Sequence, residues 1–155
     1  MLGLASFRAQ RQLTGEAKPP RLPLDLVQEF VRAGHGELDT VQRLLKEHPG
    51  LLNTSHDWGG GDFETALEGA GHVGDRAVAE YLIGQGARAN IFVLTMLGRT
   101  VEVKALLAAF PNLLRSKGPH GLTLLHHAQR GGGPAMPLLD HLMALGLSEV
   151  RLPMP

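Results

Sequence analysis

The chain has 155 residues, with 15 basic and 15 acidic side chains, eight histidines and no cysteine. The balanced charge argues against a nucleic-acid or anionic-membrane partner, and the lack of cysteine excludes disulfides and thiolate metal sites. The length fits one domain, no apolar run is long enough to span a bilayer, and no secretory signal opens the chain, so we expect a cytoplasmic protein.

Residues 1–24 are expected to form an N-terminal leader. Prolines at 19, 20 and 23 prevent a helix in the last part of this segment, and its charged side chains are mostly basic. One interpretation is a solvated segment. The other, which we prefer, is a short amphipathic helix with the apolar side chains Leu2, Leu4, Phe7 and Leu13. This helix would dock on the first of the repeats described below or on a partner.

A long stretch of the chain then occurs twice. Residues 36–52 (GELDTVQRLLKEHPGLL) align without a gap on residues 98–114 (GRTVEVKALLAAFPNLL), at a constant offset of 62. The offset pairs Gly36 with Gly98 and Val41 with Val103. Apolar residues recur at helical spacing for only two or three turns in each copy. Such short helices cannot bury their apolar face alone, so stacked helical units are expected.

Residues 65–90 (TALEGAGHVGDRAVAEYLIGQGARAN) contain two short helical patterns joined at Gly74. This segment resembles the ankyrin repeat, whose pattern is T-P-L-H-x-A-x-x-x-G followed by V-x-x-L-L-x-x-G-A-x-x-N. A second correspondence, at an offset of 58, pairs Thr65 with Thr123 and Gly74 with Gly132. The resemblance implies an all-α solenoid of about four helix-turn-helix repeats with short β-hairpin-like fingers. The repeats would span roughly 26–62, 63–91, 92–120 and 121–147 within a domain at 25–147, followed by a tail at 148–155.

The resemblance also implies structural roles. Thr65, Thr123 and His126 occupy the family's Thr and His positions, which link neighbouring repeats. Four glycines would take a left-handed conformation in the turn between paired helices; these are Gly36, Gly74, Gly98 and Gly132. Small residues would let the first helices of successive repeats approach closely, at Ala33, Ala70 and Ala128.

The finger at residues 55–64 is about four residues longer than its counterpart before Thr123 and carries the only tryptophan. Together with residues 65–67 it is similar to a W-G-G-G-D-x-E-T-A-L variant of bacterial ankyrin proteins. Two interpretations of Trp58 stay open. The ring either covers the finger or forms an exposed binding anchor. The glycine run lacks the following Lys-Ser/Thr of a phosphate-binding loop, so that function is not expected.

The family binds its partners through finger tips and the exposed end of each first helix. A protein or peptide partner is therefore expected on the concave side, without catalysis, through His35, Asp57, Trp58, Glu64, His72, Arg88, Met96, Leu97, His120, Leu122 and Arg130. Each of these is otherwise ordinary surface, or partial core in the case of Met96 and Leu97.

Metal and catalytic chemistry are not expected. His56 with Asp57, or His120 with Asp62, offer ligands in principle, but no H-x₃-H or H-E-x-x-H spacing supports them. No serine lies in a G-x-S-x-G context. We therefore predict no catalytic residue, no metal and no cofactor.

The predicted last helix carries Leu138, Leu142, Met143 and Leu145, and is unusually apolar for a terminal unit. Residues 150–155 are expected to fold back over it. The alternative function is self-association, as a structural or regulatory homodimer, through this helix and the leader.

Overall fold

The computed structural model describes residues 18–154, which are predominantly helical with one small sheet. The α-helices are α1 (Leu24–Ala33), α2 (Leu38–Glu47), α3 (Ala66–Val73), α4 (Arg76–Gly84), α5 (Ile91–Met96), α6 (Thr100–Ala109), α7 (Leu124–Gly131) and α8 (Met136–Ala144). The strands are β1 (Ser55–Asp57) and β2 (Phe63–Thr65). Short 3-10 helices are η1 (Pro49–Leu51), η2 (Pro111–Arg115), η3 (Pro119–Gly121) and η4 (Gly133–Ala135).

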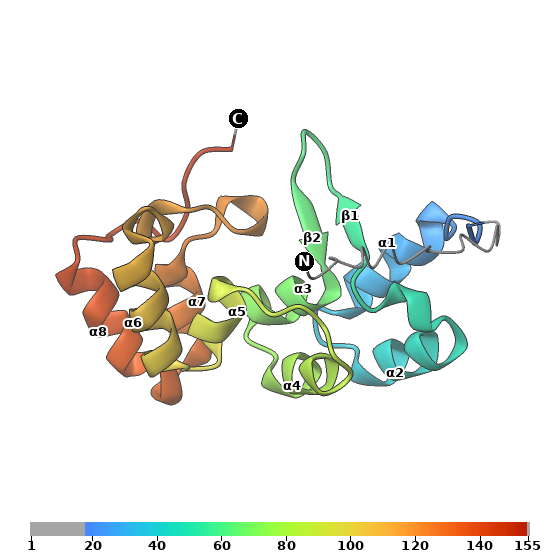
Figure 1. Cartoon of the computed structure of the whole chain (residues 1–155), viewed down its shortest axis with the longest axis horizontal. Helices are drawn as coiled ribbons and strands as arrows, with labels where there is room; N and C mark the ends of the chain where they lie inside the picture. Colours follow the sequence, from blue (N-terminus) through green and yellow to red (C-terminus); the bar gives the residue numbers. More distant parts are fainter. Residues whose placement is uncertain (1–17, 155) are drawn as a thin grey trace, which may run out of the picture.

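The helices pack as consecutive pairs, α1 with α2, α3 with α4, α5 with α6, and α7 with α8 (Figure 1). The first helices of the pairs form one row, in which α1 contacts α3, α3 contacts α5 and α5 contacts α7. Helix α3 also contacts α7 directly, past the six-residue α5. The two neighbours of α5 in the row therefore also touch each other, and we call the row closed at α5 for this reason.

Local signals place the helix ends. Thr65 caps α3 in a capping box with Glu68, and Asn90 caps α5 by accepting hydrogen bonds from two backbone N–H groups. The glycine predicted between the helices of each pair has a positive φ in all four cases: Gly36 at 127°, Gly74 at 83°, Gly98 at 74° and Gly132 at 62°. Gly74 has the predicted left-handed conformation, whereas Gly132, with a ψ of −145°, has a positive φ but a different conformation.

The buried apolar side chains form two clusters. The first joins α1 to α4 and includes Phe30, Leu44 and Leu82, while the second joins α6 to α8 and includes Leu124 and Leu138. Helix α5 contributes to both, with Val93 in the first cluster and Phe92 in the second. The chain thus has an N-terminal half (α1–α4) and a C-terminal half (α6–α8) that meet at α5.

The hairpin β1–β2 projects from the N-terminal half beside the row of first helices (Figure 1). Its register pairs His56 with Glu64, and its loop closes with a hydrogen bond from the Trp58 N–H to the Asp62 carbonyl at 3.0 Å. The three loop glycines have φ values of 127°, 65° and 86°, which strongly favour glycine. The Asp57 carboxylate accepts hydrogen bonds from two of their N–H groups. The glycine run therefore shapes a turn.

The C-terminal tail departs from the expectation. Backbone hydrogen bonds tie it to the η3 segment, from Thr123 N–H to the Val150 carbonyl and from Leu152 N–H to the Gly121 carbonyl. It does not bury the outer face of α8, where Met136 and Met143 stay 47% and 59% exposed. The expectation that the tail covers the last helix is therefore wrong for the described residues, 18–154. The expected helix at residues 2–13 lies outside the described residues.

Candidate functional site

Four polar side chains converge where the hairpin meets the row of first helices. We call His35, Glu64, His72 and His120 the histidine–glutamate cluster. One donor atom from each residue lies within 4.8 Å of all the others. His35 follows α1, Glu64 lies in β2, His72 lies in the last turn of α3, and His120 lies in η3. The cluster therefore joins the two halves of the molecule.

Glu64 is the buried centre of the cluster. The β2 side chains alternate, so that Phe63 points outward and Glu64 inward with 0% exposure. The indole N–H of Trp58 donates to Glu64 Oε2 at 2.7 Å. Glu64 Oε1 lies 2.8 Å from His72 Nε2, yet it accepts no well-aligned hydrogen bond among the described residues. A buried carboxylate oxygen without an aligned donor is costly and calls for an explanation.

The turn after α1 orients His35. Its Nδ1 lies 3.2 Å from the Val31 carbonyl oxygen and 3.0 Å from that of Arg32, so the ring donates an N–H there. Its Nε2 then faces the cluster, 3.4 Å from Glu64 Oε2 and 2.9 Å from His72 Nε2. Gly69 on α3 gives the ring its space, because a Cβ there would lie 2.9 Å from the imidazole.

Asp62 orients His120. The Asp62 carboxylate accepts the His120 backbone N–H at 2.8 Å and lies 2.7 Å from its Nδ1. The Nε2 of His120 faces Glu64 Oε1 at 3.5 Å. His120 has a φ of 60°, and it is the one non-glycine residue with positive φ in the described part of the chain. Such backbone strain is concentrated at functional sites.

Glu64 stays ionised in these surroundings. Burial raises its pKa, but the imidazoles of His35 and His72 beside the carboxylate outweigh that effect and lower the pKa to about 2. The Glu64 carboxylate beside the ring raises the pKa of His35, against the opposing effect of burial. The carboxylate thus gives the cluster a fixed negative charge.

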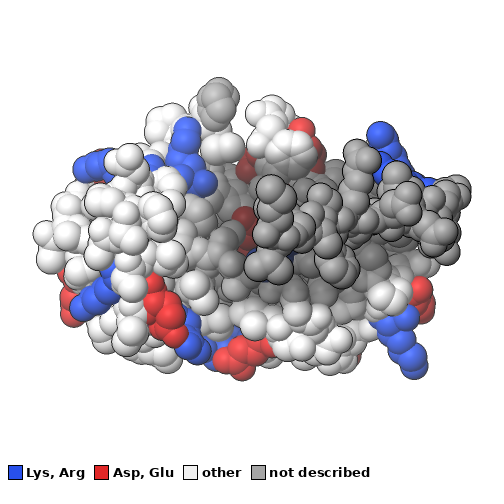
Figure 2. All heavy atoms as spheres, viewed as in Figure 1, with Lys and Arg blue, Asp and Glu red and all other residues white. Residues whose placement is uncertain are grey.

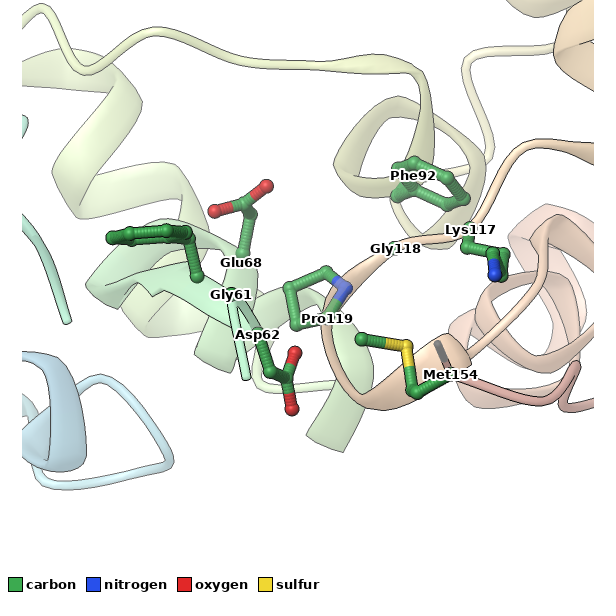
Figure 3. Close-up of a pocket in the computed structure, with 9 residues that line it drawn as sticks. Gly61, Asp62, Glu68, Phe92, Lys117, Gly118, Pro119 and Met154 are labelled. Atoms are coloured by element: carbon green, nitrogen blue, oxygen red, sulfur yellow. The ribbon is translucent and has the colours of Figure 1, made fainter. Parts of the chain in front are cut away.

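A cleft lies beside the cluster, between the hairpin and the segment before η3 (Figure 3). Its volume is about 290 Å³. We call it the hairpin cleft, and it is lined by Gly61, Asp62, Phe63, Glu68, Phe92, Lys117, Gly118, Pro119 and Met154. Phe63 is 58% exposed at its edge. In Figure 3, Asp62 and Glu68 come from the hairpin side, while Lys117 and Met154 lie across the cleft from them.

Three of the predicted partner contacts need correction. Glu64, Met96 and Leu122 are 0%, 1% and 7% exposed, so their side chains do not face a partner. Met96 belongs to the N-terminal core, and Leu122 is held under the tail by a β-bridge to Arg151. The pleat of β2 turns Glu64 inward.

Other predicted contacts are at least partly exposed, and several of them are engaged within the molecule. Trp58 is 37% exposed, and its polar atom is bound to Glu64. Asp57 closes the hairpin loop, while Arg88 donates from its backbone and side chain to Asn53. Leu97 borders an outer cleft between α4 and α6. Arg130 is exposed at the end of α7.

The three residues predicted to link repeats have distinct contacts. His126 Nε2 lies 2.8 Å from the His72 carbonyl oxygen, which ties α7 to α3. The Thr65 hydroxyl caps its own helix, and the Thr123 hydroxyl donates to the Glu149 carbonyl at 2.6 Å. Thr123 therefore holds the tail.

The chemistry of the cluster is that of a cation-binding site. Three imidazoles and a carboxylate are all ligands of transition metals. The sequence identified these four residues separately, as surface contacts, and paired only His120 with Asp62 as ligands in principle. Phe63, Gly69 and the orienting role of Asp62 were missed, because no local pattern reveals contacts between segments so far apart.

No family model, curated protein or solved structure matches the chain. Among the described residues, no helix combines the length and apolar character needed to cross a bilayer. Figure 2 shows acidic and basic side chains of the described residues dispersed over one face.

Proposed function

We propose that this protein is a non-catalytic interaction module of the ankyrin-repeat kind, which binds a protein or peptide segment in the hairpin cleft. The resemblance of residues 65–90 and 121–132 to the ankyrin pattern supports the class. The stacking of helix pairs beside a projecting hairpin agrees with it.

The observation that carries the proposal is the character of the cleft. Phe63 and Met154 are 58% and 38% exposed, and the more buried Phe92 also lines the cleft. Glu68 and Lys117 add opposite charges to this apolar lining. An apolar centre with a charged border is typical of protein–protein contact sites. A single side chain of a partner fits the volume, and the exposed hairpin extends the contact.

The test uses two exposed phenylalanines of similar accessibility. Phe63→Asp places a charge in the cleft, whereas Phe110→Asp makes the same change at the end of α6, where Phe110 is 61% exposed. Both side chains are largely solvated, so both variants should fold, which thermal melting checks. The wild-type chain and both variants are then used as bait in native lysate, with captured proteins identified by mass spectrometry.

A partner retained by wild type and Phe110→Asp but lost with Phe63→Asp would support the proposal. Its direct binding is then measured with the purified partner. Equal capture by all three baits, or capture by none, would contradict the proposal.

Self-association through α8 is a second candidate, supported by the exposure of Met136, Met143 and Leu145 at 47%, 59% and 47%. Sedimentation equilibrium over a wide concentration range tests it. A monomer at every concentration would exclude it, and a dimer dissociated by Met143→Glu would support it.

A further inference from the structure

We propose that the histidine–glutamate cluster binds one divalent first-row transition-metal ion, with Zn²⁺ as the reference ion. The ligands are the imidazoles of His35, His72 and His120 and the carboxylate of Glu64. This proposal does not rest on the interaction function proposed above.

The separations of the donor atoms fit a small coordination sphere. Neighbouring ligands in a tetrahedral zinc site lie about 3.3 Å apart, because each is about 2.0–2.1 Å from the ion. The shortest separations here are 2.8 Å between His72 Nε2 and Glu64 Oε1, and 2.9 Å between His72 and His35 Nε2. His120 Nε2 lies 3.5 Å from Glu64 Oε1. Small rotations of the rings would bring all four donors around one ion.

The hydrogen-bonding pattern leaves unshared electron pairs inside the cluster. His35 donates its Nδ1 proton to backbone carbonyls, and His120 donates its own to Asp62. The neutral form of each ring therefore directs its Nε2 lone pair toward the Glu64 carboxylate, which is also only an acceptor. Acceptors that face one another repel unless a proton or a metal cation lies between them, and the single Nε2 of His72 can donate to only one of them well. A metal ion satisfies them together, including the unpaired Glu64 Oε1.

The outer contacts are those that support metal ligands elsewhere. A ligating histidine usually donates its other N–H to a carbonyl or carboxylate, and a ligating carboxylate is itself hydrogen-bonded. His35 and His120 have such partners, and Trp58 donates to Glu64. The strained φ of His120 is explained if this residue is retained for its imidazole.

The cluster is accessible to an ion but sheltered. The His35, His72 and His120 side chains are 26%, 13% and 27% exposed, and the Glu64 side chain is fully buried. Three nitrogen ligands favour Zn²⁺, Ni²⁺, Co²⁺ or Cu²⁺ over Mg²⁺ and Ca²⁺, which prefer oxygen ligands.

The first experiment is isothermal titration calorimetry of the full, tag-free chain after removal of metals with a chelator. We expect one Zn²⁺ per chain, a rise in melting temperature with Zn²⁺, and no binding of Mg²⁺ or Ca²⁺ at the same concentrations. Failure of Zn²⁺, Ni²⁺ and Co²⁺ to bind would overturn the proposal. The four side chains would then be a hydrogen-bonded cluster without a metal.

His120→Asn is the decisive variant. Asparagine tolerates a positive φ, and the backbone N–H to Asp62 is kept, so the fold should be preserved or slightly stabilised. Zn²⁺ affinity should fall by more than the roughly 10–100-fold that loss of an outer hydrogen-bond partner causes. The matched control is His48→Asn, at an exposed histidine outside the cluster. Equal Zn²⁺ affinity in wild type and His120→Asn would overturn the proposal.

Trp58 supplies an independent readout at the site itself. It is the only tryptophan, and its ring centre lies 6.4 Å from that of His120. Ni²⁺ bound in the cluster should quench its fluorescence with the stoichiometry seen by calorimetry. If His120→Asn does not fold, X-ray absorption of the wild-type zinc complex decides the matter. Three imidazole ligands support the assignment, and fewer than three overturn it.

Gly69→Ala tests the packing that positions a ligand. The new methyl group would lie 2.9 Å from the His35 imidazole while α3 keeps its hydrogen bonds. We expect weaker Zn²⁺ binding without loss of helical content. Unchanged affinity would show that His35 is not held against α3 in the bound state.

Discussion

His127 is a buried residue outside the histidine–glutamate cluster, and it shows how strongly burial changes the protonation of a side chain. His127 is 1% exposed, and its Nδ1 donates to the Thr123 carbonyl at 2.8 Å. Its Nε2 has no hydrogen-bond partner among residues 18–154. Burial lowers the pKa of His127 to about 4, so the ring is neutral in the folded protein at neutral pH.

This residue predicts acid sensitivity. Below a pH of about 6.5 the unfolded chain protonates His127, while the folded chain resists protonation until about pH 4, so stability falls across that interval. The shift corresponds to a loss of about 3 kcal/mol. Urea unfolding at pH 7.5 and 4.5 should show a smaller loss for His127→Phe than for wild type. The same loss in both proteins would contradict the prediction, and His48→Phe should behave as wild type.

Gly34 marks a close approach between helix ends. A Cβ at this position would lie 2.3 Å from the Ala66 carbonyl oxygen, which is backbone and cannot rotate away. We expect Gly34→Ala to lower the free energy of unfolding by about 1–3 kcal/mol, as overpacking does. The control is Gly84→Ala, whose methyl group would meet nothing within 4 Å. That change should be neutral or stabilising by up to about 1 kcal/mol. Equal effects in denaturant unfolding would contradict the prediction.

At the scale of elements, α3 is the centre of the molecule, since it contacts α1, α4, α5, α7 and β2. Its first turn is held by a capping box in which the Thr65 hydroxyl accepts the Glu68 N–H at 3.2 Å. Glu68 also accepts a hydrogen bond from the Asn90 side chain at 2.7 Å, which connects this cap to the start of α5. One short helix thus joins the hairpin to both halves.

Removing the cap should weaken this junction. Thr65→Ala is expected to cost about 1 kcal/mol of stability, as loss of a capping side chain does. Thr65→Ser keeps the hydroxyl and should retain most of that stability. Chemical denaturation of both variants measures the difference, and equal destabilisation would show that the methyl group matters more than the cap.

The sequence predicted the helix pairs and their turns better than it predicted the site. Gly74 acts within a few residues of its own position, so a local pattern reveals it, whereas Thr65 was predicted to link repeats and instead caps its own helix. The sequence named Asp62 and His120 together as ligands in principle, but it did not predict their contact, which joins segments 58 residues apart. Neighbour-to-neighbour stacking alone would not bring these segments together. The inward direction of Glu64 was missed because a three-residue strand is too short to show alternation.

For the whole molecule, the two apolar clusters are joined by α5, by the contact of α3 with α7, and by the histidine–glutamate cluster. The C-terminal tail supports this junction, because its backbone pairs with residues 121 and 123, next to His120. The halves are therefore expected to unfold together.

Deletion of residues 149–155 tests this expectation. It removes the hydrogen bonds to Thr123 and Gly121 and should lower the melting temperature by at least about 2–4 °C, the shift expected for each 1 kcal/mol lost. Deletion of residues 154 and 155 alone keeps those bonds and should have little effect. Calorimetry should show a single transition in each protein, and two separate transitions would contradict the coupling of the halves.

The direct contact of α3 with α7 also limits how this molecule can evolve. Arrays whose units touch only their neighbours gain or lose units by duplication and deletion, with little effect on the rest. Here an additional unit between α4 and α5 would separate Glu64 from His120 and part α3 from α7. The contacts that close the row therefore fix the helix pairs between α3 and α7, and variation is confined to the two ends of the row and to its loops.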